Sequence, residues 1–157
     1  MSRVKLSAIL DGMETPFDET RALLDRTTGE VFSLSDEEFG AAEDGDDPED
    51  YPEWQRESIE RAKVVEADTT GRFLALPGRF DIDEWRMMCD FAFTVEDANL
   101  TDSLLNAIHG RGAFRYFKDL VHQSGLADRW YAYRNGQYRK LALEWCEAEG
   151  IDVDPNA

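Results

Sequence analysis

The sequence has few of the residues from which metal centres and disulfides are built. Its 157 residues include only two cysteines and two histidines. Cys89 and Cys146 are isolated within apolar helical patterns, and neither His109 nor His122 has a second ligand at metal-binding spacing. We interpret both cysteines as buried free thiols, with a disulfide or a reactive thiol as the alternative. We predict no metal site, no cofactor and no catalytic residue.

Long apolar runs are also absent. No segment approaches the roughly 20 apolar residues of a membrane span. The first residues, Met1–Leu6, lack the extended apolar run of a secretory signal. We therefore expect a soluble cytoplasmic protein with no membrane contact.

Positive charge is scarce and unevenly distributed. The chain has 34 acidic and 17 basic residues, which give a net charge of −17. Residues 33–53 hold ten acids and no Lys or Arg, whereas residues 110–140 hold seven bases and two acids. The densest acidic run, 43–50, is expected to be a solvated loop because like charges repel. A chain with this net negative charge repels phosphate, which argues against broad nonspecific binding of nucleic acid unless the basic face is well separated from the acidic residues.

Turn residues predict a small antiparallel sheet in the N-terminal half. Strands are expected at 20–24 and 30–34, joined by a turn that ends at Gly29. The short apolar run 72–77 predicts a third strand that pairs with this hairpin.

Helices are expected around this sheet. Apolar periodicity predicts one over about 4–14, ended by Pro16. The segment 35–38 has the Ser-x-x-Glu pattern of a capping box and opens a brief helix. A longer helix is expected over about 52–66, with Trp54 facing inward.

Further helices are expected to dominate the C-terminal half. The segment 81–84 is a second capping-box pattern, and Thr94 is expected to cap the next helix. Gly125 and Gly150, each followed by an apolar residue, predict helix C-caps. Asn135–Gly136 is expected to interrupt the last helical stretch.

These elements predict an α+β fold, with a small antiparallel sheet, made of a hairpin plus one strand, and a helix-dominated C-terminal half. The length suits a single domain over 1–157, with an acidic loop at about 43–50 and a frayed tail from about 152. One shared core is expected from the bulkiest members of the helical stripes, namely Trp85, Leu104, Phe114, Phe117 and Trp145.

Glycines, aromatic residues and bases alternate without interruption only in Gly110–Leu120. Gly110 is placed to take the positive φ that closes one helix, and Gly112 lets the chain turn at once into the next. In that second helix the expected buried side is formed by Phe114, Phe117, Leu120 and Val121. The other side is basic and carries Arg111, Arg115, Lys118 and His122.

Two interpretations of this stretch remain open. In the first, it is a core helix with a solvated cationic face, and the glycines serve only a tight turn. In the second, helix N-terminal amides and arginines converge on a phosphate or carboxylate. The residues of that anion site are Gly110, Arg111, Gly112, Arg115 and Lys118.

The run Gly-Arg-Gly-Ala-Phe-Arg-Tyr-Phe-Lys-Asp at 110–119 belongs to a wider resemblance. Together with 24–31, 74–77 and the Trp145 region, it resembles the bacterial uncharacterised protein family numbered 0158 in the UPF series. The resemblance covers most of the chain. It implies a bacterial cytoplasmic protein and no particular activity, because the family has none assigned.

Two functions therefore stand beside each other. The first is an interaction or regulatory module whose basic helix turn binds an acidic protein, a nucleic-acid backbone or a phosphorylated ligand. The second is an enzyme acting on a phosphorylated or carboxylated small molecule, with Arg111 and Arg115 as an anion clamp and Asp119 as acid or base. We favour the first, because basic neighbours keep Asp119 ionised, unlike a tuned general acid.

Overall fold

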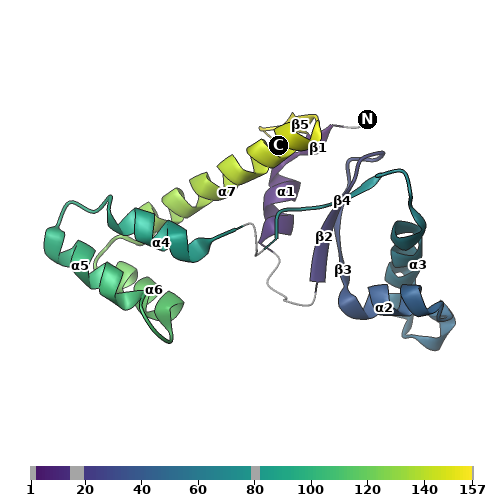
Figure 1. The fold of residues 1–157 in the computed structure, drawn as a ribbon, viewed down its shortest axis with the longest axis horizontal. Coiled ribbons are helices and arrows are strands. Elements are labelled where there is room, and N and C mark those ends of the chain that lie inside the picture. Colours follow the sequence, from purple (N-terminus) through teal and green to yellow (C-terminus); the bar gives the residue numbers. More distant parts are fainter. Residues whose placement is uncertain (1–2, 15–19, 79–81, 157) are drawn as a thin grey trace. The chain divides into compact units, whose positions relative to one another are not determined.

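The computed structural model describes residues 3–14, 20–78 and 82–156 (Figure 1). The chain divides into two compact units, one made of 1–78 with 142–157 and the other of 79–141. The helix end predicted at Pro16 and the helix opening predicted at Asp81 lie outside the described residues.

The first unit contains the expected antiparallel sheet. Strands β2 (Thr20–Asp25) and β3 (Val31–Ser35) form a hairpin, and β4 (Phe73–Ala75) pairs with the other edge of β2. The hairpin turn includes Gly29, whose φ of 77° lies in the left-handed region. The hairpin and the third strand are thus confirmed, as is the α+β fold.

The two ends of the described chain meet in the first unit. Strand β1 (Val4–Lys5) pairs in parallel with β5 (Val153–Asp154), and helix α1 (Leu6–Met13) follows β1 directly. The tail that was expected to fray from residue 152 therefore carries a strand. Pairing between segments so far apart in the sequence leaves no local pattern, which is why the sequence did not indicate it.

The acidic segment is more ordered than a loop. The Ser35 hydroxyl and the Glu38 side chain form the predicted capping box, which opens α2 (Asp36–Asp44). The 3-10 helix η1 (Pro48–Asp50) follows, so only 45–47 of the expected loop is irregular. The acids of residues 43–50 stay exposed or half-buried.

Asp46 holds this segment in place. Its carbonyl oxygen accepts a hydrogen bond from Lys63 Nζ at 2.6 Å, and its carboxylate accepts one from the Tyr51 hydroxyl at 2.6 Å. The second bond raises the pKa of Tyr51 to about 12. Two specific contacts thus order a stretch whose like charges favour an open loop.

Helix α3 (Glu53–Ala67) has the expected span but a different buried face. Trp54 is 77% exposed, and the buried stripe is Gln55, Ile59 and Ala62. The inward orientation predicted for Trp54 was wrong, because the stripe at i, i+4 and i+7 begins one residue later.

The second unit is helical and has an aromatic core. Helices α4 (Glu84–Ala92), α5 (Ala98–Ala107) and α6 (Ala113–Gln123) are followed by α7 (Ala127–Glu149), which continues into the first unit. The ring centroid of Phe117 lies 4.9 Å from that of Trp130 and 6.2 Å from that of Phe91, in edge-to-face contacts. Leu104 is also fully buried, as expected.

The other members predicted for this core lie elsewhere. Trp85 is 42% and Phe114 is 45% exposed, and the half-buried Trp145 belongs to the first unit. The indole N–H of Trp85 donates to the Ile108 carbonyl at 3.0 Å, so this side chain keeps a polar partner at the edge of the core. Trp130, which was not among the predicted core residues, is instead the largest fully buried side chain of the second unit.

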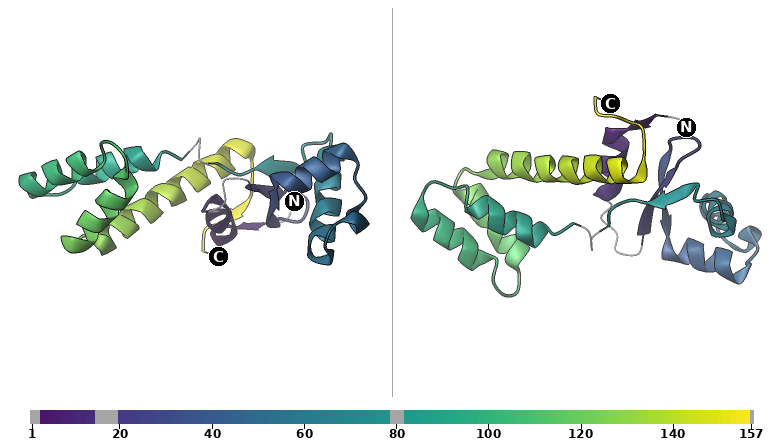
Figure 2. Two further views of the ribbon diagram at one scale, coloured as in Figure 1. Left: turned by 90° about the horizontal axis from the view of Figure 1, so that it is seen from below. Right: turned by 45° about the horizontal axis from the view of Figure 1, so that its top comes forward.

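Most helix ends within the described residues followed local signals. The Leu126 and Ile151 amides close α6 and α7 on Val121 and Cys146 carbonyls, so the C-caps predicted at the preceding glycines are confirmed. Asp97, not Thr94, caps α5, since the Thr94 hydroxyl donates to the Phe91 carbonyl. Helix α7 passes through Asn135–Gly136 without interruption (Figure 2). The length of α7 outweighs one glycine, which costs only about 1 kcal/mol in a helix.

Candidate functional site: the basic turn before helix α6

Two left-handed glycines set the turn between α5 and α6. Gly110 has φ 93°, as the sequence predicted, and Gly112, the N-cap of α6, has φ 74°. Trp85 holds the start of the turn through the Ile108 carbonyl, and its ring makes an edge contact with His109 at 6.3 Å between centroids. The turn is therefore a defined structure joined to α4.

Replacing Gly112 by alanine should destabilise the protein by about 1 kcal/mol or more. A Cβ there would lie 3.1 Å from Tyr116 Cε2, and the left-handed φ strains any side chain. Thermal unfolding measures the loss. Gly136→Ala is the matched control, since that glycine lies inside α7 with open space around its Cβ position and should gain up to about 1 kcal/mol. Equal midpoints for the two variants would contradict the backbone argument.

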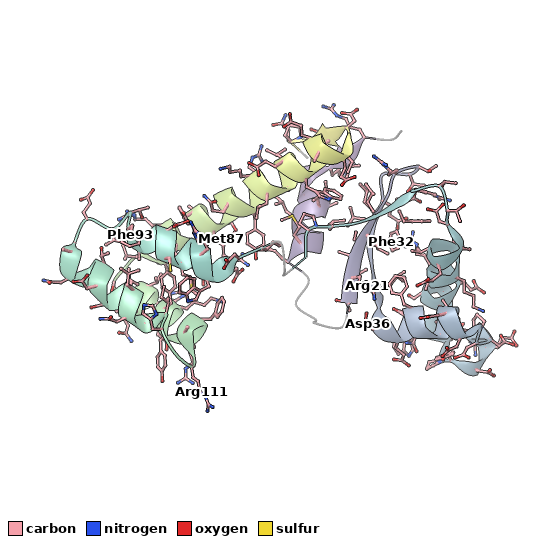
Figure 3. All side chains as sticks on the ribbon, viewed as in Figure 1. Arg21, Phe32, Asp36, Met87, Phe93 and Arg111 are labelled. Carbon is pink, nitrogen blue, oxygen red and sulfur yellow. The ribbon has the colours of Figure 1, made fainter. Side chains whose placement is uncertain are left out.

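The predicted basic residues all reach solvent. Arg111, Arg115 and Lys118 are exposed, and the side chain of Arg115 is 82% accessible. Arg111 projects outward from the turn in Figure 3. We call Gly110, Arg111, Gly112, Arg115 and Lys118 the basic turn. All five lie in the turn before α6 or in the first two turns of that helix.

The N-terminus of α6 adds partial positive charge to the basic turn. Gly112 has no side chain with which to cap the helix, and no acidic residue lies in the first turn. The first amides of a helix point along its axis and favour an anion. Arg111 and Arg115 thus lie at the same end of α6 as the backbone N–H groups that no side chain caps.

Asp119, the carboxylate of the enzymatic alternative, is a surface group. Its side chain is 59% exposed and lies 4.0 Å from Arg115 in an i,i+4 pair. Water screens such a pair, so it holds Arg115 only weakly. A carboxylate in this setting stays hydrated and is not enclosed in a pocket as a general acid would be.

One family accounts for nearly the whole chain. The family described as "Uncharacterised protein family (UPF0158)" matches residues 3–154. The chain belongs to this family. A UPF0158 protein of Pseudomonas aeruginosa is 36% identical over 72 residues, a match that covers 45% of this chain and 46% of that protein. The match thus spans about half the length of that relative. No solved structure matches the chain.

Sequence reasoning missed a polar network in the second unit of this UPF0158 chain. Arg134 donates from Nε and Nη2 to Glu84 Oε1 at 2.9 and 2.6 Å, and the Tyr138 hydroxyl donates to the same oxygen. Burial raises the pKa of Glu84, but these bonds and the charge of Lys118 outweigh it and leave the pKa below its usual value. The network fastens α4 to α7 with an ionised carboxylate. Glu84 lies at least 50 residues from both of its partners in sequence, beyond any local signal.

Exposed aromatic rings beside the basic turn were also missed. Phe114 and Tyr116 are 45% and 55% exposed, and the Arg115 guanidinium lies 6.0 Å from the Tyr116 ring centroid. Further along α6 the His122 ring lies 6.0 Å from that of Tyr131, which is 41% exposed. Placing Phe114 in the core hid this feature, although rings alternating with bases were visible in the sequence.

The division into units also divides the charge. Counted over the sequence, residues 79–141 contain nine bases and nine acids, whereas the other unit contains eight bases and 25 acids. The unit that carries the basic turn is therefore neutral, and the whole −17 belongs to the other unit.

The described residues offer little support for a reactive thiol, a metal site or a membrane span. Cys89 is half-buried and Cys146 is buried, both are free, and burial raises the pKa of each thiol. Within the described residues, no group of three or more His, Cys, Asp or Glu side chains is placed to hold a metal ion. Over the same ranges, no helix combines the length and the apolar character needed to cross a membrane.

Proposed function

We propose that this protein is a cytoplasmic interaction module that binds an anionic partner at the basic turn. The observation that carries the proposal is that Arg111, Arg115 and Lys118 are all exposed, in or shortly after a turn that leads into an α6 N-terminus capped by no side chain. Arginine presents several donors in a fork that matches phosphate or carboxylate. Backbone amides at the helix start complement the same charge.

Exposure favours binding over catalysis. The side chain of Arg115 is 82% accessible and that of Asp119 is 59% accessible, so both stay hydrated. Catalysis by charge stabilisation gains most from a water-excluded site, where electrostatic interactions are strong. A surface that contacts a large partner gains its water exclusion from the partner.

The test is binding of inorganic polyphosphate by the double variant Arg111→Ala/Arg115→Ala. We expect its affinity at low salt to fall by at least about tenfold. A protein with fewer cations neutralises fewer phosphates, so its binding releases fewer counterions from the polyphosphate. The slope of log affinity against log salt should also shrink by about one for each arginine removed. Titration by calorimetry at several salt concentrations measures both.

A matched control separates the basic turn from bulk charge. Arg86 on α4 is 73% exposed and pairs with Asp90 at i,i+4 just as Arg115 pairs with Asp119. Arg86→Ala should leave polyphosphate affinity within about twofold of wild type. If Arg86→Ala weakens binding as much per charge as the double variant, or if the wild type binds no polyanion at low salt, the proposal fails.

A further inference from the structure

We propose that the anionic partner is a single-stranded nucleic acid, whose bases stack on Phe114 and Tyr116 while Arg111, Arg115 and Lys118 hold its phosphates. This inference rests on the proposed anion binding and names the class of its ligand. Positions 114, 115, 116 and 118 of α6 supply four of these five groups, and Arg111 in the preceding turn supplies the fifth.

The two rings are exposed beside a helix face that buries others completely. Phe117, on the same helix, is 0% exposed, whereas Phe114 and Tyr116 are 45% and 55% exposed. Leaving this apolar area in water forgoes the roughly 25 cal/mol per Å² that burial would contribute. Exposed aromatic area next to charge therefore marks a surface that a ligand can cover.

The rings flank the cations rather than standing apart from them. Phe114 lies one helical turn before Lys118, on adjoining positions of the same side of α6. The Tyr116 ring folds back toward the turn, since its Cε2 lies 3.1 Å from where a Gly112 Cβ would be. Arg115 lies between the two in sequence, with its guanidinium 6.0 Å from the Tyr116 ring centroid. Each ring thus has a phosphate-binding side chain beside it.

This interleaving suits a nucleic-acid strand better than a protein surface. Protein interfaces gather apolar residues in a central core and place charges on a rim. Single strands instead present a charged backbone and a planar base at every nucleotide, and proteins meet them with aromatic platforms along a basic surface. A duplex keeps its bases paired and stacked, which leaves exposed rings without a partner.

The overall acidity of the chain is compatible with this ligand. The residues of the second unit sum to zero charge, and the −17 belongs to the other unit. Within the second unit, residues 110–140 hold seven bases against two acids. A strand at α6 therefore meets the positive charge of its own unit.

The experiment compares two fluorescent probes of equal length and charge, an oligoadenylate and an abasic oligonucleotide with the same backbone. Phe114→Leu and Tyr116→Leu should each weaken oligoadenylate binding by about five- to tenfold, since a stacked base contributes about 1–3 kcal/mol. Neither should change binding of the abasic probe. Phe114→Tyr and Tyr116→Phe, which keep a ring, should retain affinity for both probes.

Phe93 supplies the matched control. Its ring is 70% exposed at the end of α4, away from Arg111 in the same unit (Figure 3). Phe93→Leu should leave both affinities unchanged, which separates a specific platform from general stickiness of exposed rings. Circular dichroism and thermal melts establish that the leucine variants remain folded, as their exposed positions lead us to expect.

The outcomes separate this inference from the proposed function. If Arg111→Ala/Arg115→Ala weakens both probes while the leucine variants bind like wild type, anion binding stands and the nucleic-acid inference is overturned. Equal weakening of both probes by the leucine variants also overturns it. So does displacement of oligoadenylate by poly-glutamate as efficiently as by unlabelled oligoadenylate, which would indicate an acidic protein. If the arginine variant leaves both affinities intact, the proposed function fails as well.

Discussion

Replacing Phe117 by alanine should lower the free energy of unfolding by about 3 to 5 kcal/mol. Phe117 is 0% exposed, and its ring packs edge-to-face on Phe91 and Trp130. Truncation removes the transfer free energy of a whole ring and leaves a cavity between two large neighbours that cannot easily collapse. Urea denaturation followed by tryptophan fluorescence measures the loss, with Trp130 as a probe within the same cluster.

The control for Phe117 is another phenylalanine of the same unit. Phe93 is 70% exposed, so Phe93→Ala should change the unfolding free energy by no more than about 0.5 kcal/mol. A Phe117→Ala protein that unfolds at the wild-type denaturant concentration would mean that the aromatic cluster around Trp130 is misassigned.

Replacing Asp25 by asparagine should cost about 1 to 2 kcal/mol at neutral pH. Asp25 is 4% exposed and accepts hydrogen bonds from Arg72 Nε at 2.9 Å, Arg72 Nη2 at 2.7 Å and the Thr27 amide at 2.9 Å. The Arg72 hydrogen bonds lower the pKa of Asp25 from 3.8 to about 2, against the opposing effect of burial. A shift of that size corresponds to about 2.5 kcal/mol, which solvent around the 39%-exposed Arg72 side chain reduces.

The sign of the shift defines a pH window for the Asp25 prediction. A carboxyl whose folded pKa is depressed stabilises the fold above its unfolded pKa, and that contribution is lost as pH falls through the folded value. The stability difference between wild type and Asp25→Asn should therefore be constant above about pH 5 and shrink as pH falls toward 2. Other carboxyls titrate in both proteins and cancel in the difference.

A surface ion pair of the same unit serves as the control for Asp25. The Asp152 carboxylate lies 3.6 Å from Arg3 Nε, and both side chains are at least 60% exposed. Asp152→Asn should cost no more than about 0.5 kcal/mol. A stability difference for Asp25→Asn that stays constant down to pH 2 would show that the Arg72 ion pair does not depress the pKa of Asp25.

The parts of the fold that depend on neighbouring residues were readable from the sequence. The Ser35 capping box, the Gly29 hairpin turn and the glycine C-caps were all predicted at the correct residues, because each satisfies backbone groups within a few positions. The positive φ of Gly110 belongs to the same class. Local chemistry thus determined where the basic turn lies and that its backbone needs glycine.

The network and the strand pair that escaped prediction join distant residues. Glu84 meets Arg134 and Tyr138 across α4 and α7, and β1 pairs with β5 from the far end of the chain. Such contacts depend on how whole elements pack, so neither periodicity nor spacing encodes them. The residues were visible in the sequence, but only the packing of helices and strands determined which of them form hydrogen bonds with each other.

Burial of individual rings was likewise decided by tertiary packing. Periodicity assigned Phe114 and Phe117 to one buried stripe, yet the core of the second unit reaches Phe117 and stops short of Phe114. The apolar stripe of a helix can be wider than the surface that neighbouring helices cover. In the second unit the buried tryptophan that packs on Phe117 is Trp130, whereas Trp85, which was expected in the core, is 42% exposed. The sequence by itself determined an α+β chain with a glycine-set basic turn. The tertiary structure decided which aromatic side chains remain exposed beside that turn, because only the packed neighbours determine how far the core extends.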